Sequence, residues 1–194
     1  FAFYGDLPRI DENYRFACVR GPLTAQTLGL DPKLAITDGA ALLRNFDFPA
    51  VEKKFKFCFI PHHASLFFND WKVICNEAGY HYINPLTDPQ DILTQIRESE
   101  TVIAEAMHGA IVADALRIPW IPVKLYPTIN EFKWRDWTGS MSLDYEPQIL
   151  PSIYSNEMID QKVAAKLRSS KNIFYSKGIS KIYQTYQNQF LFKG

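Results

Sequence analysis

A single histidine, His108, follows an apolar stretch in the middle of the chain. Residues 101–106 (TVIAEA) predict a buried strand, and the alanine-rich segment after the histidine predicts a helix. Ligands of open α/β sheets bind at the carboxyl ends of the strands, where the following helices begin. The free N–H groups of a helix N-terminus favour anions there. Histidine also transfers protons near neutral pH. His108 is therefore a candidate for anion binding or acid–base chemistry, and a purely structural histidine is the alternative.

Three basic side chains are candidates to share an anionic ligand with His108. Arg20 ends an apolar segment directly before a second predicted helix, Lys124 lies in the next apolar strand, and Lys133 follows that strand. A histidine and two or three cations beside helix N-termini suit a small ligand that carries both phosphate and carboxylate. The structural alternatives are an ion pair with an acidic neighbour for Arg20 and a solvated helix position for Lys133.

Glu105 and two adjacent histidines, His62 and His63, are further candidates at the same place. Glu105 falls in a buried strand, where a carboxylate needs a partner, so we expect it to orient the imidazole of His108 or to pair with a lysine. Adjacent strand residues point in opposite directions. One histidine of the pair should therefore line the ligand crevice, and the other should pack. No further cluster stands at metal-ligand spacing, so no metal site is expected.

The composition excludes several classes of protein. The chain has 21 basic and 21 acidic side chains among 194 residues, which leaves no positive excess for nucleic acid. No apolar run approaches the roughly 20 residues that a bilayer-spanning helix needs. The three cysteines, Cys18, Cys58 and Cys75, lack CxxC spacing and have apolar neighbours. They predict buried thiols in a reducing cytoplasm rather than a disulfide framework.

From residue 55 onward, short apolar runs alternate with amphipathic segments. Such alternation predicts a parallel sheet with helices on both faces, the α/β class. The predicted strands are 55–60, 80–84, 101–106 and 120–125. One predicted helix begins at an N-cap, Ser65, and ends at Gly79, and another opens at Asp88-Pro89. The apolar face expected for the first of these helices consists of Phe67, Trp71, Ile74, Cys75 and Ala78.

The part of the chain before residue 55 predicts the end of a similar unit. Its expected elements are a strand over 14–20, a helix over 22–28 and a short strand over 34–37. We therefore divide the chain into the remnant of an N-terminal Rossmann-like half (1–45), a linker (46–54), a complete Rossmann-like domain (55–154) and a tail (155–194). No glycine-rich phosphate loop occurs, and we expect that the front of the first half is missing.

The tail, residues 155–194, differs from the rest in charge and pattern. It carries seven basic and two acidic residues, and its aromatic and aliphatic residues recur at helical spacing. This pattern predicts a basic amphipathic helix. Two interpretations remain open, packing against the body of the protein and contact with an anionic membrane surface or carrier lipid.

Several segments of the sequence resemble the polysaccharide pyruvyltransferase family. They are VRGPLTAQTLGL (19–30), ITDGAALL (36–43), IPHHASL (60–66), AEAMHGAIVADAL (104–116) with IPWIPV after it, and EFKWRDW (131–137). The resemblance extends over roughly residues 12–152. Its most specific parts are the His-Gly block and FKWRDW. Within the family, the chain looks most like the branch that decorates bacterial exopolysaccharides such as succinoglycan.

This resemblance implies a fold and an activity. Family members resemble glycosyltransferases of the two-Rossmann GT-B type and transfer pyruvate from phosphoenolpyruvate to a sugar, usually as a ketal. The acceptor would be a sugar of an exopolysaccharide or of its lipid-linked precursor, handled in the cytoplasm at the inner face of the membrane. Phosphoenolpyruvate would be a co-substrate, with no further cofactor. Members are commonly longer and carry a Gly-rich N-terminal motif that is absent here.

By position, the resemblance also assigns residues. The donor-site histidine falls on His108, the strand-end arginine on Arg20, and a downstream lysine on Lys133, with Lys124 as the alternative. Many members have Arg-Leu directly before the histidine, where this chain has Ala106-Met107. One donor-binding cation is thus lacking or comes from elsewhere.

Two questions stay open at the level of sequence. His108 would either protonate C3 of the donor or donate a hydrogen bond to the departing phosphate. The rival functions are a GT-B glycosyltransferase that uses a nucleotide sugar and a non-catalytic remnant or binding subunit.

Overall fold

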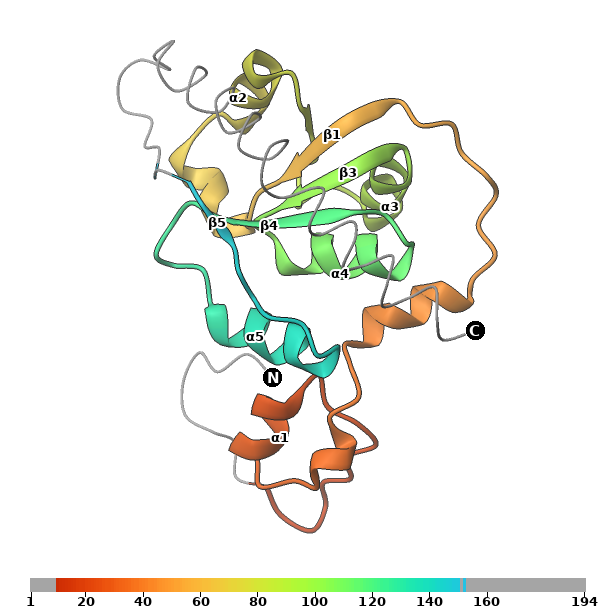
Figure 1. Ribbon diagram of the computed structural model, residues 1–194, viewed down its shortest axis with the longest axis vertical. Helices are drawn as coiled ribbons and strands as arrows, with labels where there is room; N and C mark the ends of the chain where they lie inside the picture. Colours follow the sequence, from red (N-terminus) through yellow and green to blue (C-terminus); the bar gives the residue numbers. More distant parts are fainter. Residues whose placement is uncertain (1–9, 151, 153–194) are drawn as a thin grey trace.

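An open, five-stranded parallel sheet forms the centre of the computed structural model, which describes residues 10–150 and residue 152 (Figure 1). The strands are β1 (Phe55–Ile60), β2 (His81–Tyr82), β3 (Ser99–Ala104), β4 (Trp120–Lys124) and β5 (Gln148–Ile149). Their order in the sheet is β2-β1-β3-β4-β5, and every neighbouring pair is parallel. The predicted α/β class with a parallel sheet is confirmed.

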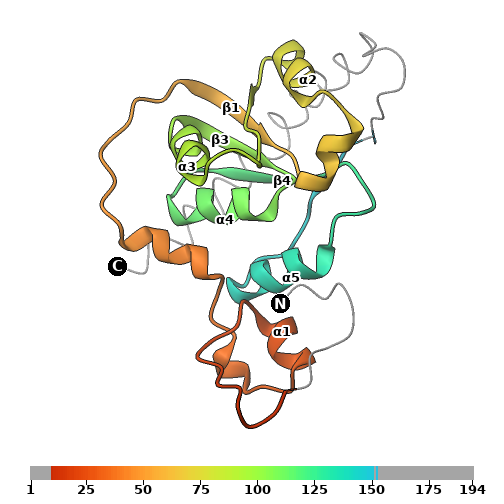
Figure 2. The same cartoon turned by 180° about the vertical axis from the view of Figure 1, so that it is seen from behind.

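Helices cover both faces of this sheet. The helices of the described residues are α1 (Pro22–Thr27), α2 (Trp71–Ala78), α3 (Pro89–Arg97), α4 (Met107–Ala115) and α5 (Glu131–Ser140), with short 3-10 helices η1 (Pro32–Leu34), η2 (Gly39–Asn45) and η3 (His63–Phe68). Of these, α2 lies on one face of the sheet, and α3 and α4 lie on the other. Alternate residues of β1 face opposite sides, so that Cys58 packs with α3 and α4 while Phe59 packs with α2. Strands buried on both faces explain the continuous apolar runs in the sequence. Figure 2 shows α2 and α4 on opposite sides of the sheet.

The strand register brings the candidate residues to one edge. Ile60 pairs with Ala104, and Ala104 pairs with Pro122, so the chain leaves β1, β3 and β4 at nearly the same level. The chain runs from β1 to β2 on one side and returns to β3 on the other, which makes the β1/β3 boundary a topological switch point. Ligands of doubly wound sheets bind outside the strand ends at such a point.

The single helix predicted from Ser65 to Gly79 is wrong. The structure has two helices here, η3 and α2, because Asn69 is extended and the carboxylate of Asp70 accepts from Val73 N (3.2 Å) to begin α2 anew. Phe67, expected to face inward, is 86% exposed on η3. The other four residues of the predicted face are buried on α2, and Gly79 ends that helix in the left-handed region as predicted.

The strand predicted over residues 14–20 is also absent from the described structure. Only Val19 makes a bridge, to Ala35, and this bridge is also all that remains of the short strand expected over 34–37. A strand needs a neighbour for its N–H and C=O groups, and this segment finds one at a single residue. As a consequence Cys18 is exposed, contrary to the prediction of three buried thiols.

The other predicted elements differ mainly in length. β1 has the predicted bounds, and α3 begins at Pro89 behind an Asp88 cap as expected. β2 is shorter than the predicted strand 80–84, and β3 ends at Ala104, so Glu105 lies just beyond it. Cys58 and Cys75 are buried as predicted, and burial raises the pKa of the Cys58 thiol to about 11.

Residues 46–54 form an irregular segment (the strap) that is attached to the end of α3 by hydrogen bonds and an ion pair. The ammonium of Lys53 donates to the carbonyl oxygens of Arg97 (2.8 Å) and Ser99 (2.7 Å), and Lys54 pairs with Glu98. Before the strap, η2 packs against α4 and α1 packs against α5. The division into a remnant, a linker and a complete domain stays a prediction.

Among the described residues, none of the helices combines the length and apolar character needed to cross a membrane. The basic tail predicted to form an amphipathic helix, residues 155–194, lies outside the described residues.

Candidate functional site

His108 lies in the first turn of α4. β3 ends at Ala104, and Ala106 is the N-cap that precedes the helix. Ala106 provides no side-chain hydrogen bond, so the N-terminus of α4 has no side-chain cap. Gly109 lets this helix approach the sheet closely, because a Cβ at that position would lie 2.6 Å from Ile60 Cγ2. The glycine beside the histidine thus places the start of α4 directly over the end of β1.

Asp38 joins the predicted arginine to the predicted histidine. Arg20 Nε donates to Asp38 Oδ2 at 2.8 Å, and the same oxygen lies 3.8 Å from His108 Nε2. Asp38 also caps η2 by accepting from Ala40 N at 3.0 Å. Residues distant in the sequence therefore form one cluster at the carboxyl end of β3.

The sequence analysis did not single out Asp38. Its partners lie 18 and 70 residues away, so no local spacing connects it to them. The available signal was the motif ITDGAALL, whose only acidic residue is Asp38.

The electrostatics of this cluster favour a charged Asp38 and a neutral His108. Burial alone would raise the pKa of Asp38, but the Ala40 N–H, the Arg20 guanidinium and His108 outweigh it and hold that pKa below the usual value. Partial desolvation lowers the pKa of His108 even though its side chain is 66% exposed, and Arg20 and Lys133 lower that pKa further against the opposing effect of Asp38. At neutral pH, the imidazole is therefore mainly neutral.

The two candidate lysines have different surroundings. Lys133 lies in the first turn of α5 and is near enough to His108 and His62 for its charge to lower the pKa of both. Lys124, at the end of β4, pairs with Glu131 of α5. The structure thus brings Lys133, rather than Lys124, to the Arg20–His108 cluster.

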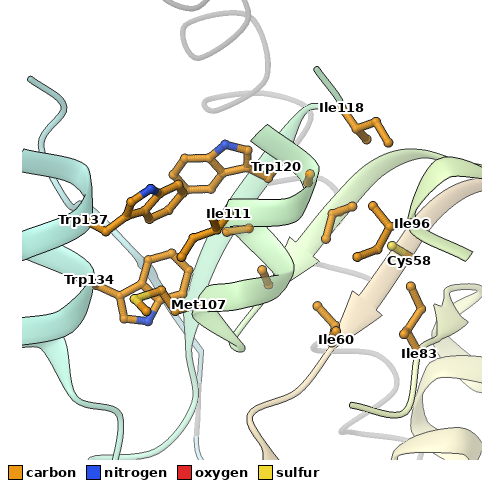
Figure 3. Close-up of a cluster of buried hydrophobic side chains, with 14 of the residues drawn as sticks. Cys58, Ile60, Ile83, Ile96, Met107, Ile111, Ile118, Trp120, Trp134 and Trp137 are labelled. Carbon is orange, nitrogen blue, oxygen red and sulfur yellow. The ribbon is translucent and has the colours of Figure 1, made fainter. Parts of the chain in front are cut away.

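Aromatic packing fixes the helix that carries Lys133. Figure 3 shows Trp134 and Trp137 of α5 reaching toward Ile111 of α4 and Trp120 of β4. The ring centroids of Trp120 and Trp137 are 5.1 Å apart, and both α5 tryptophans are almost completely buried. The FKWRDW motif therefore combines a buried aromatic face with a lysine at the edge of the sheet.

Glu105 is fully buried and holds two strand ends together. Its Oε2 accepts from His62 N at 3.0 Å, and its Oε1 accepts from Leu125 N at 3.2 Å. Burial raises the pKa of Glu105 above its ordinary value, although these N–H groups favour the carboxylate. Sequence analysis expected a contact with the His108 imidazole or with a lysine. The carboxylate instead braces the backbone after β1 and β4.

His62 and His63 do not point in opposite directions. They follow β1 in a turn, so the strand alternation does not apply, and their ring centroids lie 4.1 Å apart. His62 Nδ1 accepts from Ala64 N (3.3 Å), which leaves the ring proton on Nε2. Burial, with the charges of His63 and Lys133, lowers the pKa of His62 to about 4. His62 is therefore a neutral hydrogen-bond donor beside Lys133.

The described residues contain no group of three or more His, Cys, Asp or Glu side chains arranged to hold a metal ion. The arrangement instead combines a guanidinium, an ammonium and two imidazoles with the uncapped N-terminus of α4. Such a set can bind a small anion and can donate a proton to it.

Comparison with known proteins identifies the family and a curated relative. The family described as polysaccharide pyruvyl transferase matches residues 8–125, which include Arg20, Asp38 and His108. The succinoglycan biosynthesis protein ExoV of Rhizobium meliloti (strain 1021) is 39% identical over 151 residues, which are 76% of this chain and 48% of that protein. The chain thus spans about half the length of this curated relative. No solved structure gives a significant match.

Proposed function

The chain belongs to the polysaccharide pyruvyl transferase family, and from this premise we propose that it transfers pyruvate from phosphoenolpyruvate to a sugar in exopolysaccharide synthesis. The product would be a pyruvate ketal. The acceptor would be a sugar of the polysaccharide or of its lipid-linked precursor, reached at the cytoplasmic face of the membrane. A GT-B-like architecture is part of this proposal.

The cluster of Arg20, His108 and Lys133 is the observation that carries the proposal. Phosphoenolpyruvate bears a phosphate and a carboxylate close together, and two cations with an imidazole match its charges. Arg20 Nη1 is buried and has no hydrogen-bond partner among the described residues, although Nε is bound to Asp38. An unsatisfied buried donor is costly, and an anionic oxygen would satisfy it.

The reaction follows from the chemistry of the donor. A sugar hydroxyl adds to C2 and loses its proton while C3 takes up a proton, and the C2–O bond to phosphate then breaks, with the bonding electrons leaving on the phosphate. A second hydroxyl forms the second C2–O bond, loses its proton and closes the ketal, with inorganic phosphate as the other product. General acid–base assistance of this kind contributes about 10²–10⁴-fold to a rate.

His108 is assigned the proton-donating role in this proposal. Its pKa lies below the usual value for histidine, and a bound anion would raise that pKa by favouring the imidazolium. Donor binding would therefore favour the protonated imidazole that the next step uses. His108 then either transfers this proton to C3 of the donor or donates a hydrogen bond to the departing phosphate.

A calorimetric titration with phosphoenolpyruvate, beside UDP-sugars, tests the proposal. We expect binding of phosphoenolpyruvate by the wild type and loss of binding in His108→Ala and in Lys133→Ala. Lys72→Ala, which removes an exposed lysine from α2, is the matched control and should bind as the wild type does.

Two other results would redirect the assignment. A preference for the nucleotide sugar would indicate a glycosyltransferase, because the same cations suit a diphosphate. Absence of binding to either compound would contradict a donor site in this chain and would favour a binding subunit.

A further inference from the structure

Asp136, on α5, is a fully buried carboxylate outside the Arg20–His108 cluster. Its Oδ1 accepts from Thr24 N at 2.8 Å, and its Oδ2 accepts from Thr24 Oγ1 at 2.5 Å. The two residues are 112 positions apart in the sequence. This double hydrogen bond joins α5 to α1, the helix that begins at Pro22, two residues after Arg20.

The backbones of α1 and α5 also touch at this point. A Cβ on Gly21 would lie 1.8 Å from the carbonyl oxygen of Asp136, so only glycine fits there. A Cβ on Gly139 would lie 3.2 Å from Pro22 Cγ. Gly21 follows Arg20 directly, so its contact with α5 fixes the position of the Arg20 backbone and therefore the point from which the arginine side chain extends.

The Asp136 carboxylate also occupies the position that an anion would take at the N-terminus of α1. It accepts the N–H of Thr24, the third residue of that helix, as an N-cap side chain would. The sequence analysis expected this helix end to favour a bound anion. In the structure, the Asp136 carboxylate takes that place and accepts the hydrogen bond from Thr24 N. The contribution of this segment to the proposed donor site is therefore Arg20.

α5 itself is held firmly and carries a second cation of the site. Its two tryptophans pack into the main hydrophobic cluster (Figure 3), and Lys133 lies one turn before Asp136. Figure 1 shows α5 between α1 and α4. α5 packs against α1, and its tryptophans share a hydrophobic cluster with residues of α4. Ser140 Oγ, at the end of α5, donates to Thr37 Oγ1 (3.3 Å), next to Asp38.

We propose that Asp136 is a positioning residue of the donor site. Through Thr24 it fixes the Arg20 guanidinium relative to Lys133 and His108, and it thereby sets the affinity for phosphoenolpyruvate. This inference rests on the proposed function. Asp136 itself touches neither substrate nor reacting atoms, because its two carboxylate oxygens are both bound to Thr24.

Titration with phosphoenolpyruvate of Asp136→Asn and Thr24→Val tests the inference. Both changes keep the side-chain volume: Thr24→Val removes the hydrogen bond of the hydroxyl, and Asp136→Asn removes the negative charge that strengthens both hydrogen bonds. We expect the dissociation constant to rise about 10-fold in Asp136→Asn and by a smaller factor in Thr24→Val, since small displacements of a ligand group weaken binding steeply. Thr27→Val is the matched control on the same helix, because its hydroxyl bonds only to Leu23 O, and it should bind as the wild type does.

A double-mutant cycle separates positioning from a general loss of structure. If Asp136 acts through Arg20, Asp136→Asn should have no further effect on affinity in an Arg20→Ala background. Hydrogen exchange at residues 20–28 should be faster in Asp136→Asn than in Thr27→Val. Additive effects in the cycle, or wild-type affinity in a folded Asp136→Asn, would overturn the inference.

The two proposals fail in different ways. A wild-type chain that binds no phosphoenolpyruvate would contradict the proposed function and this inference with it. A wild-type chain that binds it, with unchanged affinity in both variants, would contradict this inference alone. If Asp136→Asn does not fold, Thr24→Val gives the same comparison.

Discussion

Two regions of the molecule contribute to the same candidate site in different ways. One is the N-terminal segment, residues 10–45, and the other is the sheet with its helices, residues 55–149, called here the sheet domain. The sheet domain supplies His108 and Lys133 from helices that are backed by a continuous hydrophobic cluster. The N-terminal segment supplies Arg20 and Asp38, which are held mainly by polar contacts. Its large apolar side chains are often exposed, among them Tyr14, Ile36 and Leu42.

This difference indicates which half of the site is easier to displace. Apolar packing is shared among many neighbours, so a single change rarely releases a helix such as α4. The placement of Arg20 depends on the Asp38 pair and, through Thr24, on Asp136. Loss of either contact should move the guanidinium, while the sheet and His108 stay in place.

The largest expected contrast between the two regions is at a pair of glycines. Gly109→Ala should lower the free energy of unfolding by about 1–3 kcal/mol, because the new methyl group overlaps Ile60. Gly39→Ala, in the N-terminal segment, meets no atom within 4 Å. It should leave the stability unchanged or raise it by less than about 1 kcal/mol. Urea unfolding of both variants measures the contrast, and equal losses would show that α4 is no more tightly packed than η2.

A medium effect is expected from the aspartate that links the regions. Asp38→Asn should cost about 1 kcal/mol of stability, since it weakens the hydrogen bond to Arg20. It should also lower the pKa of His108, because the charge of Asp38 raises that pKa. NMR titration of the imidazole measures this shift.

Asp88→Asn is the control for this prediction. Asp88 is likewise an N-cap, accepting from Gln90 N at 2.8 Å, and asparagine caps equally well. Its substitution should change neither the stability nor the His108 titration. A His108 pKa that is unchanged, or that rises, in Asp38→Asn would show that the two regions are not electrostatically coupled.

The smallest effect concerns the pH dependence of stability in the sheet domain. The pKa of His62 is about 4 in the folded state against an ordinary value of 6.5, chiefly because of burial. Between these values the unfolded chain binds a proton that the folded chain does not, so stability falls as the pH decreases from about 6.5 to 4. The pKa of Asp38 lies below 3.8, so the link to the N-terminal segment weakens only at lower pH.

His62→Asn isolates this contribution, because asparagine keeps an N-cap acceptor for η3 and does not titrate. Its free energy of unfolding should fall less between pH 7 and pH 5 than that of the wild type. Parallel pH profiles for the two proteins would contradict the assignment of a neutral, half-buried His62.

Local signals account for the elements that were predicted well. The bounds of β1 follow from an uninterrupted apolar run, and α3 follows from an Asp-Pro start with periodic isoleucines. The break at Asn69–Asp70 was missed because a second N-cap inside an apolar periodicity is a weak signal. The strand over 14–20 was predicted from composition, but a strand also needs a neighbour, which no local pattern specifies.

The α/β class, the family and the charged residue types at the edge of the sheet could all be predicted from patterns in the sequence. These depend on apolar runs, caps and motifs, which act over a few turns of chain. The folded arrangement was needed to show that Asp38 joins Arg20 to His108, that Lys124 pairs with Glu131, and that Asp136 binds Thr24. It also showed that the charge of Lys133 acts on both His62 and His108. These contacts join residues up to 112 positions apart, and such pairs are chosen by sheet register and helix packing rather than by spacing along the chain.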